Sequence, residues 1–257
     1  MTMNLIAINV GNTRTQLGAF AEGKVVEQTH VSNDDLGELS AIARRMYESA
    51  SGGGEDVVVY LASVNDTVST QVERIVGEAL DQKIWRMESD VNIPIGRKLD
   101  GGAFVGEDRL LAAAAAYDKF KQAAIVVDAG TAVTVDFVDG EGTFHGGAIL
   151  PGMRMMLQSL HEHTAQLPGV EPDKPAEPIG HNTAQAMLSG AFHGVRGAVR
   201  ELAEKYAEIY MAYPKIIATG GDAELLFDGY DLVEAIIPEL TLSGMAIAHR
   251  HAMAQSE

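Results

Sequence analysis

Short apolar runs and amphipathic stretches alternate along the chain. The runs have the length of buried strands, and the stretches carry apolar residues at helical spacing. The predicted strands are 5–9, 15–20, 24–31, 57–62, 124–128, 132–138, 143–149 and 215–219, the predicted helices are 34–49, 68–80, 109–120, 153–163, 182–210 and 240–254, and a glycine-rich turn is predicted at 51–54. The second half repeats the order of the first, which predicts an α/β protein of two similar lobes.

The boundary between the two lobes is expected near the end of the helix predicted at 109–120. We place it between residues 117 and 123, which gives an N-terminal lobe of 1–120 and a C-terminal lobe of 121–257. The loop at 165–180 contains prolines and is predicted to be the least structured segment.

Two loops with the same pattern follow the first strand of each half. Their sequences are Asn9-Val10-Gly11-Asn12-Thr13 and Asp128-Ala129-Gly130-Thr131. Each has a polar residue at the strand end, then a glycine, then a hydroxyl. Backbone N–H and Thr hydroxyl groups in such a turn can donate to a phosphate. An ordinary hairpin turn is the alternative for either loop alone, but the pair suggests a duplicated fold that holds a phosphorylated ligand from both sides.

Composition and charge restrict the partners. The 257-residue chain is 46% hydrophobic and carries a formal net charge of -17, which argues against binding nucleic acid or an anionic membrane through a broad basic face. It has no cysteine, which excludes disulfides and thiolate metal sites and fits a cytoplasmic protein. The apolar run at 5–8 is far too short for a signal peptide or a membrane span.

The common nucleotide-binding signatures are missing from the sequence. There is no Gly-x4-Gly-Lys-Ser/Thr loop, and no Gly-x-Gly-x-x-Gly opens a helix after a strand. The spacing of Gly190, Gly194 and Gly197 falls inside a helical pattern, where close packing of the helix is the expected meaning.

Two further clusters carry candidate chemistry. Gly106-Glu107-Asp108-Arg109 begins an apolar helix. An acid there can be a plain N-terminal cap, or it can accept a proton from a hydroxyl that the Arg positions. The glycines of Thr219-Gly220-Gly221 follow a strand and would let a flat ligand approach the backbone, with a simple turn as the alternative.

These clusters, in this order and spacing, resemble the type III pantothenate kinases of the acetate and sugar kinase/actin superfamily. The resemblance covers nearly the whole chain and includes Gly146–Gly152, Leu167-Pro168, Ile179–Thr183, Ser189-Gly190 and Pro238–Gly244. It implies a duplicated ribonuclease H-like (actin-like ATPase) fold, with two similar lobes and a cleft between them. It also implies ATP-dependent phosphorylation of pantothenate, the first step of coenzyme A biosynthesis, with Mg²⁺ and a monovalent cation (K⁺ or NH₄⁺).

The resemblance assigns a role to each cluster. Asp108 would accept the proton from the primary hydroxyl of pantothenate, and Asp128 would ligate the monovalent cation. Thr183 would reach pantothenate from the neighbouring subunit of a homodimer. The implied ATP contacts are Asn9, Val10, Gly11, Asn12, Thr13, Arg14, Thr15, Gln16, Thr131, Gly220 and Gly221, and the implied pantothenate contacts are Gly106, Glu107, Asp108, Arg109 and Thr183.

Two positions depart from the family pattern. The first phosphate loop of the family begins with Asp, which would hold Mg²⁺ through water, whereas this chain has Asn9. Asn keeps a carbonyl acceptor but loses the charge that hard cations favour, and a loss of roughly 10²-fold in rate would correspond to about 2.7 kcal/mol. The family also carries an aromatic substrate contact near Leu99, which is absent here.

These departures leave three hypotheses open. The first is a working pantothenate kinase. The second is a non-catalytic or weakly active nucleotide-binding regulator of the same fold, which Asn9 keeps possible. The third is a kinase of another small alcohol, because the residues expected around pantothenate near Leu99 conform less well to the family.

Overall fold

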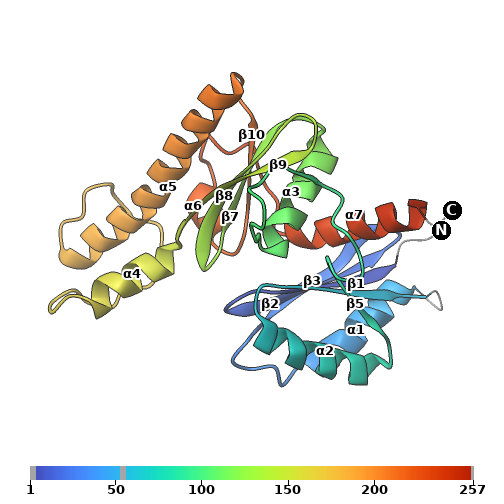
Figure 1. The fold of residues 1–257 in the computed structure, drawn as a ribbon. Helices are drawn as coiled ribbons and strands as arrows, with labels where there is room; N and C mark the ends of the chain where they lie inside the picture. The colour runs from blue at the N-terminus through green and yellow to red at the C-terminus, as the bar shows by residue number, and fades with distance from the viewer. Residues whose placement is uncertain (1–3, 53–55, 256–257) are drawn as a thin grey trace. The chain divides into compact units, whose positions relative to one another are not determined.

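The computed structural model describes residues 4–52 and 56–255 (Figure 1). The described chain forms two compact units. The first unit lies within Met1–Ile95, Asp100–Asp118 and Glu239–Glu257, and the second consists of Gly96–Leu99 and Lys119–Pro238. Among the described residues, no helix is both long and apolar enough to cross a membrane.

The first unit is built on one mixed sheet. Its elements are β1 (Leu5–Val10), β2 (Arg14–Ala21), β3 (Lys24–Ser32), α1 (Leu39–Ser51), β4 (Val58–Ser63), α2 (Asp66–Leu80), β5 (Ile84–Arg86), α3 (Glu107–Phe120) and α7 (Leu240–Gln255). The strand order is β3-β2-β1-β4-β5. β1, β2 and β3 form antiparallel pairs, whereas β4 runs parallel to β1 and β5 runs parallel to β4.

Helices cover both faces of this first sheet. Ile6 and Ile8 of β1 belong to one buried cluster with Met46 of α1 and Val76 of α2. Because side chains alternate along a strand, the residues between them face the other side, where α7 lies (Figure 1). A Cβ placed on Gly18 of β2 would lie 2.8 Å from Leu242 Cδ1 of α7. Gly18 therefore allows α7 to lie directly on the sheet.

A buried polar contact also joins α7 to this sheet. Tyr60 Oη of β4 lies 2.7 Å from His249 Nδ1 of α7. Burial raises the pKa of Tyr60 to about 12 and lowers the pKa of His249. A Cβ at Gly244 would collide with the backbone of Leu111 in α3, so α7 and α3 are tightly packed. The last helix thus belongs to the first unit, and in this respect the observed units differ from the expected division into 1–120 and 121–257.

The second unit repeats the plan of the first. Its elements are β6 (Gly96–Arg97), β7 (Ala124–Ala129), β8 (Ala132–Val138), β9 (Thr143–Pro151), α4 (Met153–Glu162), α5 (Thr183–Tyr210), β10 (Lys215–Thr219), α6 (Ala223–Phe227) and β11 (Ala235–Ile236). The strand order is β11-β10-β7-β8-β9-β6. Its core joins Ile125 and Val127 of β7 to Phe192, Val195 and Val199 of α5.

The two units share the same strand connections. β1-β2-β3 and β7-β8-β9 are antiparallel meanders. β4 then joins β1 in parallel, just as β10 joins β7 in parallel. This arrangement confirms the predicted α/β fold with two similar halves. It also confirms that each candidate phosphate loop is the tip of a hairpin, because one connects β1 to β2 and the other connects β7 to β8.

Most differences from the expected elements are short pieces. The elements that the pattern did not predict are β5, β6, α6 and β11. Helix α1 begins at Leu39 rather than at residue 34. The loop at 165–180 contains no helix or strand, as expected. In the glycine-rich turn predicted at 51–54, Gly53 and Gly54 lie outside the described residues, and Gly52 takes a left-handed conformation at the end of α1.

The packing role expected for the glycines of α5 is mostly wrong. A Cβ at Gly190 or Gly197 would have no neighbour within 4 Å among the described residues, and at Gly194 it would make an ordinary contact of 3.6 Å with Met156 Cε of α4. All three glycines lie on the exposed side of the helix. The sequence pattern identified the helix correctly but not the direction in which these positions face.

Candidate active site

The first candidate phosphate loop reverses the chain between β1 and β2. Asn9 pairs with Gln16 across the hairpin. The Gly11 N–H donates to the Arg14 carbonyl oxygen at 3.0 Å. Val10 is fully buried, so only its backbone can reach a ligand. Two of the expected ATP contacts in this loop, Asn12 and Thr13, are exposed.

The Asn9 side chain presents a buried acceptor in this loop. Within the described residues, Asn9 Oδ1 is buried and has no hydrogen-bond partner. A buried polar atom without a partner is costly, and such atoms often face a ligand, an ion or a water. The atom therefore fits an oxygen that accepts from a metal-bound water or faces a cation, although the amide brings no charge.

Asn33, just after β3, braces the same loop. Its Nδ2 donates to the Gly11 carbonyl oxygen at 2.8 Å, and its backbone N–H donates to the Thr13 carbonyl oxygen at 3.0 Å. Its Oδ1 accepts from Thr15 Oγ1 at 2.8 Å. Thr15 is fully buried, so its hydroxyl is committed to this brace and its ATP contact stays a prediction. The sequence reading did not single out Asn33, because nothing along the chain places the end of β3 beside this turn.

The expected substrate motif begins α3 in the same unit. Asp108 Oδ1 accepts from the Arg109 backbone N–H at 2.8 Å. A Cβ at Gly106 would lie 2.5 Å from Asp108 Oδ1 and 3.1 Å from Val64 Cγ1. Only glycine leaves room for both groups. The start of a helix also favours a negative side chain through its N–H groups.

A short segment after β4 links this motif to the first loop. The Val64 N–H donates to the Val10 carbonyl oxygen at 3.1 Å, while the side chain of Val64 lies against Gly106. The structure therefore brings together two clusters that are almost a hundred residues apart in the sequence, the loop at 9–16 and the motif at 106–109.

Glu107 is half-buried between α3 and β4. Its Oε2 accepts from the Ser63 backbone N–H at 3.0 Å. The pKa of Glu107 is raised to about 7, chiefly because burial disfavours the charged carboxylate. The carboxylates of Glu88 and Asp108 act in the same direction, whereas the Ser63 N–H and the Arg86 guanidinium oppose them.

The second candidate phosphate loop lies in the second unit and packs against the turn after β10. The Asp222 N–H donates to the Ala129 carbonyl oxygen at 2.9 Å. Gly220 has a φ of +94°, a conformation that favours glycine. A Cβ there would collide with Asp128 Oδ1 and with the Ala129 carbonyl oxygen. The candidate residues Asp128, Gly130 and Gly220 are thus gathered at one edge of this sheet.

Gly152, at the end of β9, supports the second loop from another direction. Its N–H donates to the Thr131 carbonyl oxygen at 3.1 Å. A Cβ at Gly152 would collide with the carbonyl oxygens of Gly130 and Thr131. Thr131 itself is exposed, as a phosphate contact requires. Gly152 belongs to a segment that resembles the family, but the sequence alone assigns it no role.

A row of oxygen-bearing side chains crosses the second sheet beside this loop. Asp128 of β7 is in register with Thr219 of β10 and with Thr134 of β8, and paired residues of neighbouring strands project to the same face. Thr134 Oγ1 is buried and has no hydrogen-bond partner among the residues that the structure describes. Asp128 and Thr134 together fit the oxygen donors that a hard cation prefers. Thr134 was not singled out from the sequence, where it reads as one polar position in an alternating strand.

Thr183 is exposed at the first position of α5. The helix start is well capped, because Asn182 Oδ1 accepts from the Gln185 N–H and Gln185 Oε1 accepts from the His181 N–H, both at 2.9 Å. A Cβ at Gly180 would collide with the backbone of this first turn. Local structure therefore fixes Thr183, which belongs to the second unit, whereas Asp108 belongs to the first.

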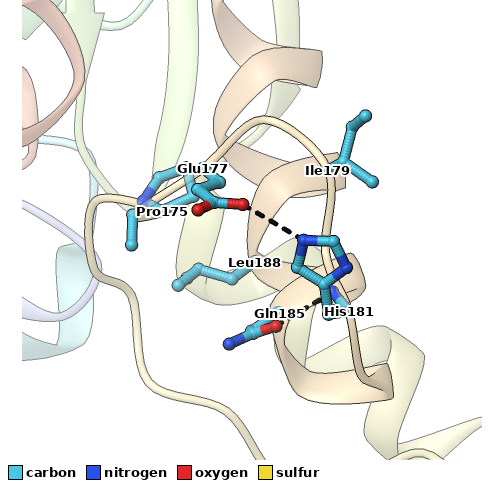
Figure 2. A pocket seen from close by; sticks show the side chains of 7 residues that line it. Pro175, Glu177, Ile179, His181, Gln185 and Leu188 are labelled. Atoms are coloured by element: carbon cyan, nitrogen blue, oxygen red, sulfur yellow. Dashed lines mark hydrogen bonds and ion pairs between the residues drawn. The ribbon is translucent and has the colours of Figure 1, made fainter.

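A small cavity of about 150 Å³ lies beside the start of α5 (Figure 2). Figure 2 shows His181 between Glu177, whose Oε2 lies 3.1 Å from His181 Nε2, and Gln185. The labelled residues around this cavity are Pro175, Glu177, Ile179, His181, Gln185 and Leu188. It is far too small for ATP and is no candidate for the nucleotide site.

Leu99, where the family has an aromatic contact, lies just after β6 in the second unit. Its Cδ2 would lie 3.5 Å from a Cβ at Gly146 of β9. Leu99 is partly buried.

Comparison with known proteins decides the family. A family model described as type III pantothenate kinase matches residues 5–205. The chain belongs to this family. A type III pantothenate kinase of Rhodospirillum rubrum is 34% identical over 252 residues, which cover 96% of this chain and 98% of the relative.

Solved structures confirm the fold expected for a type III pantothenate kinase. A Baf family transcriptional activator from Campylobacter jejuni has a TM-score of 0.61 at 16% identity and covers 97% of this chain and 99% of its own. MreB5 of Spiroplasma citri bound to AMPPNP has a TM-score of 0.51 at 11% identity, with coverage of 99% and 98%. At these identities the likeness concerns the fold alone, and it is the fold of the actin-like ATPases.

Proposed function

We propose that this type III pantothenate kinase transfers the γ-phosphoryl group of ATP to the primary hydroxyl of pantothenate and so starts coenzyme A biosynthesis. The observation that carries the proposal is the position of Asp108. Its carboxylate is held at the start of α3 by the Arg109 N–H, above a glycine that leaves it room, and the segment 63–64 ties it to the first phosphate loop.

In this proposal Asp108 accepts the hydroxyl proton while the side chain of Arg109 orients the substrate. Phosphoryl transfer needs positioning and charge stabilisation more than covalent chemistry. In the same proposal, the loop at 9–16 and Thr131 would donate to the phosphate oxygens, and the turn at 220–221 would contact the adenosine. Mg²⁺, when bound, would neutralise charge on those oxygens, and Asn9 Oδ1 is the side-chain oxygen that would face it, directly or through water.

We assign the monovalent cation to Asp128, with Thr134 Oγ1 as a second oxygen in register with it. The Thr134 hydroxyl is buried and has no hydrogen-bond partner in the described part of the chain, which supports a ligand on this face of the sheet. Potassium or ammonium should therefore support activity, and sodium should substitute poorly. Equal rates in sodium-only and potassium buffers would contradict this assignment.

We also propose that the kinase acts as a homodimer, in which Thr183 of one subunit contacts pantothenate at Asp108 of the other. The capped, exposed position of Thr183 supports this role. Mixing Asp108→Asn and Thr183→Val subunits, each impaired alone, should partly restore activity through hybrid dimers. A monomer in light scattering at micromolar concentration would remove the basis for the proposal.

The decisive test replaces the proposed base. Asp108→Asn should lower kcat by about 10²–10⁴-fold while the fold and ATP binding remain. A coupled ADP-release assay with millimolar ATP, Mg²⁺ and potassium measures turnover with pantothenate and with a few other small alcohols. A mutant that keeps more than about a tenth of the wild-type rate would refute the assignment, and preference for another alcohol would point to the departure at Leu99.

The alternative is a nucleotide-binding regulator, and Asn9 is the observation that favours it. Asn9 is a neutral amide whose Oδ1 has no hydrogen-bond partner among the described residues, and it stands where the family resemblance implies a carboxylate near Mg²⁺. In that case the wild type would bind ATP, measured by calorimetry, but would release no ADP with any alcohol tested.

A further inference from the structure

Glu107 connects the substrate motif to the strand beside the first phosphate loop. Its carboxylate leaves the first turn of α3 and accepts the Ser63 N–H at 3.0 Å. Ser63 is the last residue of β4 and is in register with Val10 of β1. One hydrogen bond therefore spans from the residue before the proposed base to the strand that flanks the loop at 9–16.

The partner of Glu107 is itself rigidly held. Ser63 Oγ donates to the Asn65 carbonyl oxygen at 3.0 Å, and it accepts from the Asn65 N–H at 2.9 Å. Asn65 Oδ1 in turn accepts from the Val68 N–H and caps α2. Because hydrogen bonds fix both Ser63 and Asn65 in this turn, the turn offers α3 a well-ordered point of attachment.

Neighbouring charged groups influence whether Glu107 is protonated or charged. The charged groups that face it are Asp108 on its own helix, Glu88 after β5, and Arg86 on β5. Arg86 also forms an ion pair with Glu73, at 2.5 Å, so its positive charge is shared. Two acids begin one helix here, and pairs of carboxyl groups in unlike environments commonly divide into one charged and one protonated group.

We propose that Glu107 is a positioning residue: its bond to Ser63 holds the first turn of α3, and with it Asp108, against the end of β4, and its charge state sets a pH dependence of phosphoryl transfer. The raised pKa means that Glu107 carries its proton below about pH 7 and loses it above. A charged acceptor makes the stronger hydrogen bond, and the added charge makes Asp108 a better proton acceptor. The rate should therefore rise as Glu107 ionises.

Two substitutions separate these roles. Glu107→Gln keeps an acceptor for the Ser63 N–H but cannot ionise, whereas Glu107→Ala removes the acceptor. Between pH 6 and pH 8, kcat/KM for pantothenate should increase about tenfold more in the wild type than in Glu107→Gln. Glu107→Ala should be about tenfold below Glu107→Gln at every pH, mainly in kcat. Glu78→Gln, on the exposed side of α2, is the matched control and should follow the wild-type profile.

Two readouts do not depend on turnover. The amide resonance of Ser63 should shift with pH near 7 in the wild type and not in Glu107→Gln. The folded-state pKa of Glu107 lies above the ordinary value of 4.5, so the folded protein holds this proton more tightly than the unfolded chain does. The stabilisation that results is fully present below pH 4.5 and is lost as the pH rises through about 7. The melting temperature of wild type should therefore fall relative to Glu107→Gln between pH 6 and pH 8.

The inference rests on the proposed kinase activity, and the two can fail separately. Absence of turnover in the wild type with any alcohol would overturn the kinase, while the Ser63 resonance would still test the bond. A Glu107→Ala variant with the wild-type kcat/KM at every pH would overturn the positioning role alone. The same pH profile in wild type and Glu107→Gln would overturn the role of its charge.

Discussion

The two candidate phosphate loops are the same turn built with different supports. The first starts with a neutral amide, Asn9, and Asn33, from a neighbouring strand end, braces it with three hydrogen bonds, two through its side chain and one from its backbone N–H. The second starts with a carboxylate, Asp128, and two glycines, Gly152 and Gly220, let other backbone segments press against it. In the first loop, a substitution can remove hydrogen bonds of the supporting side chain. In the second, the backbone segments are so closely packed that there is no room for an added side-chain atom.

The loops also differ in which side-chain oxygen is buried without a hydrogen-bond partner among the residues that the structure describes. In the first it belongs to the strand-end residue, Asn9 Oδ1, and in the second to the residue paired with Asp128 across the hairpin, Thr134 Oγ1. Negative charge is therefore kept at the strand end of only one loop, the one to which we assign the monovalent cation. The predictions below test whether this difference in charge and support matters.

The largest effect is expected from making the second loop neutral like the first. Asp128→Asn should lower kcat by about 10²–10³-fold, because an amide of similar shape replaces the carboxylate that we propose as the cation ligand. Steady-state rates across a potassium titration measure this, with melting temperature as the check on folding. A variant that still responded to potassium as the wild type does would show that the cation binds elsewhere.

The next largest effect concerns backbone packing. Gly220→Ala should lower the free energy of unfolding by about 2–4 kcal/mol, because the new Cβ meets Asp128 and the Ala129 carbonyl at a positive φ. In Gly11→Ala, a change within the first loop itself, the new Cβ meets only the Arg14 carbonyl oxygen among the described residues, at 3.1 Å, and the change should lower the free energy of unfolding by less than about 1 kcal/mol. Urea unfolding of both variants measures the difference, and equal losses would contradict the distinction between the two supports.

Removing the side-chain brace should have a smaller effect. Asn33→Ala deletes two of the three bonds and leaves the buried Thr15 hydroxyl without its partner, which should lower the free energy of unfolding by about 1–2 kcal/mol. The KM for ATP should rise as the loop loosens. Asp34→Ala, an exposed neighbour, is the control, and equal behaviour of the two variants would show that Asn33 does not hold the loop.

The repeated strand-and-helix plan could be predicted from the sequence because it rests on local periodicity. Apolar runs such as 5–9 and 124–128 became central strands, and the polar, glycine and hydroxyl residues after them became hairpin tips. Short elements such as β6 and β11 carry only two residues each, too few for a periodic signal.

What the sequence could not give depends on contacts between distant segments. The bonds of Asn33 to Gly11 and of Glu107 to Ser63 join residues 22 and 44 positions apart. The assignment of α7 to the first unit rests on Tyr60 and His249, which are 189 positions apart. No local pattern encodes such pairs, and the family resemblance named the loops without saying what holds them.

The smallest and most informative change gives the first loop the charge of the second. In the protein without nucleotide, Asn9→Asp places a carboxylate at a buried position whose oxygen has no partner among the described residues, so it should lower the free energy of unfolding by about 1 kcal/mol. With Mg²⁺ and ATP bound in the proposed site, the same charge would lie near the metal, which would compensate its desolvation.

Turnover should therefore move in the opposite direction to stability. Asn9→Asp should raise kcat by about threefold to tenfold and sharpen the dependence on Mg²⁺. Pantothenate phosphorylation by the wild type and by Asn9→Asp, measured side by side over a Mg²⁺ titration, decides this, with Asn9→Ala as the variant that removes the oxygen altogether. If wild type and Asn9→Asp both fold and bind ATP but neither forms product, the first loop has lost more than a charge, and the chain is a nucleotide-binding regulator rather than a slowed kinase.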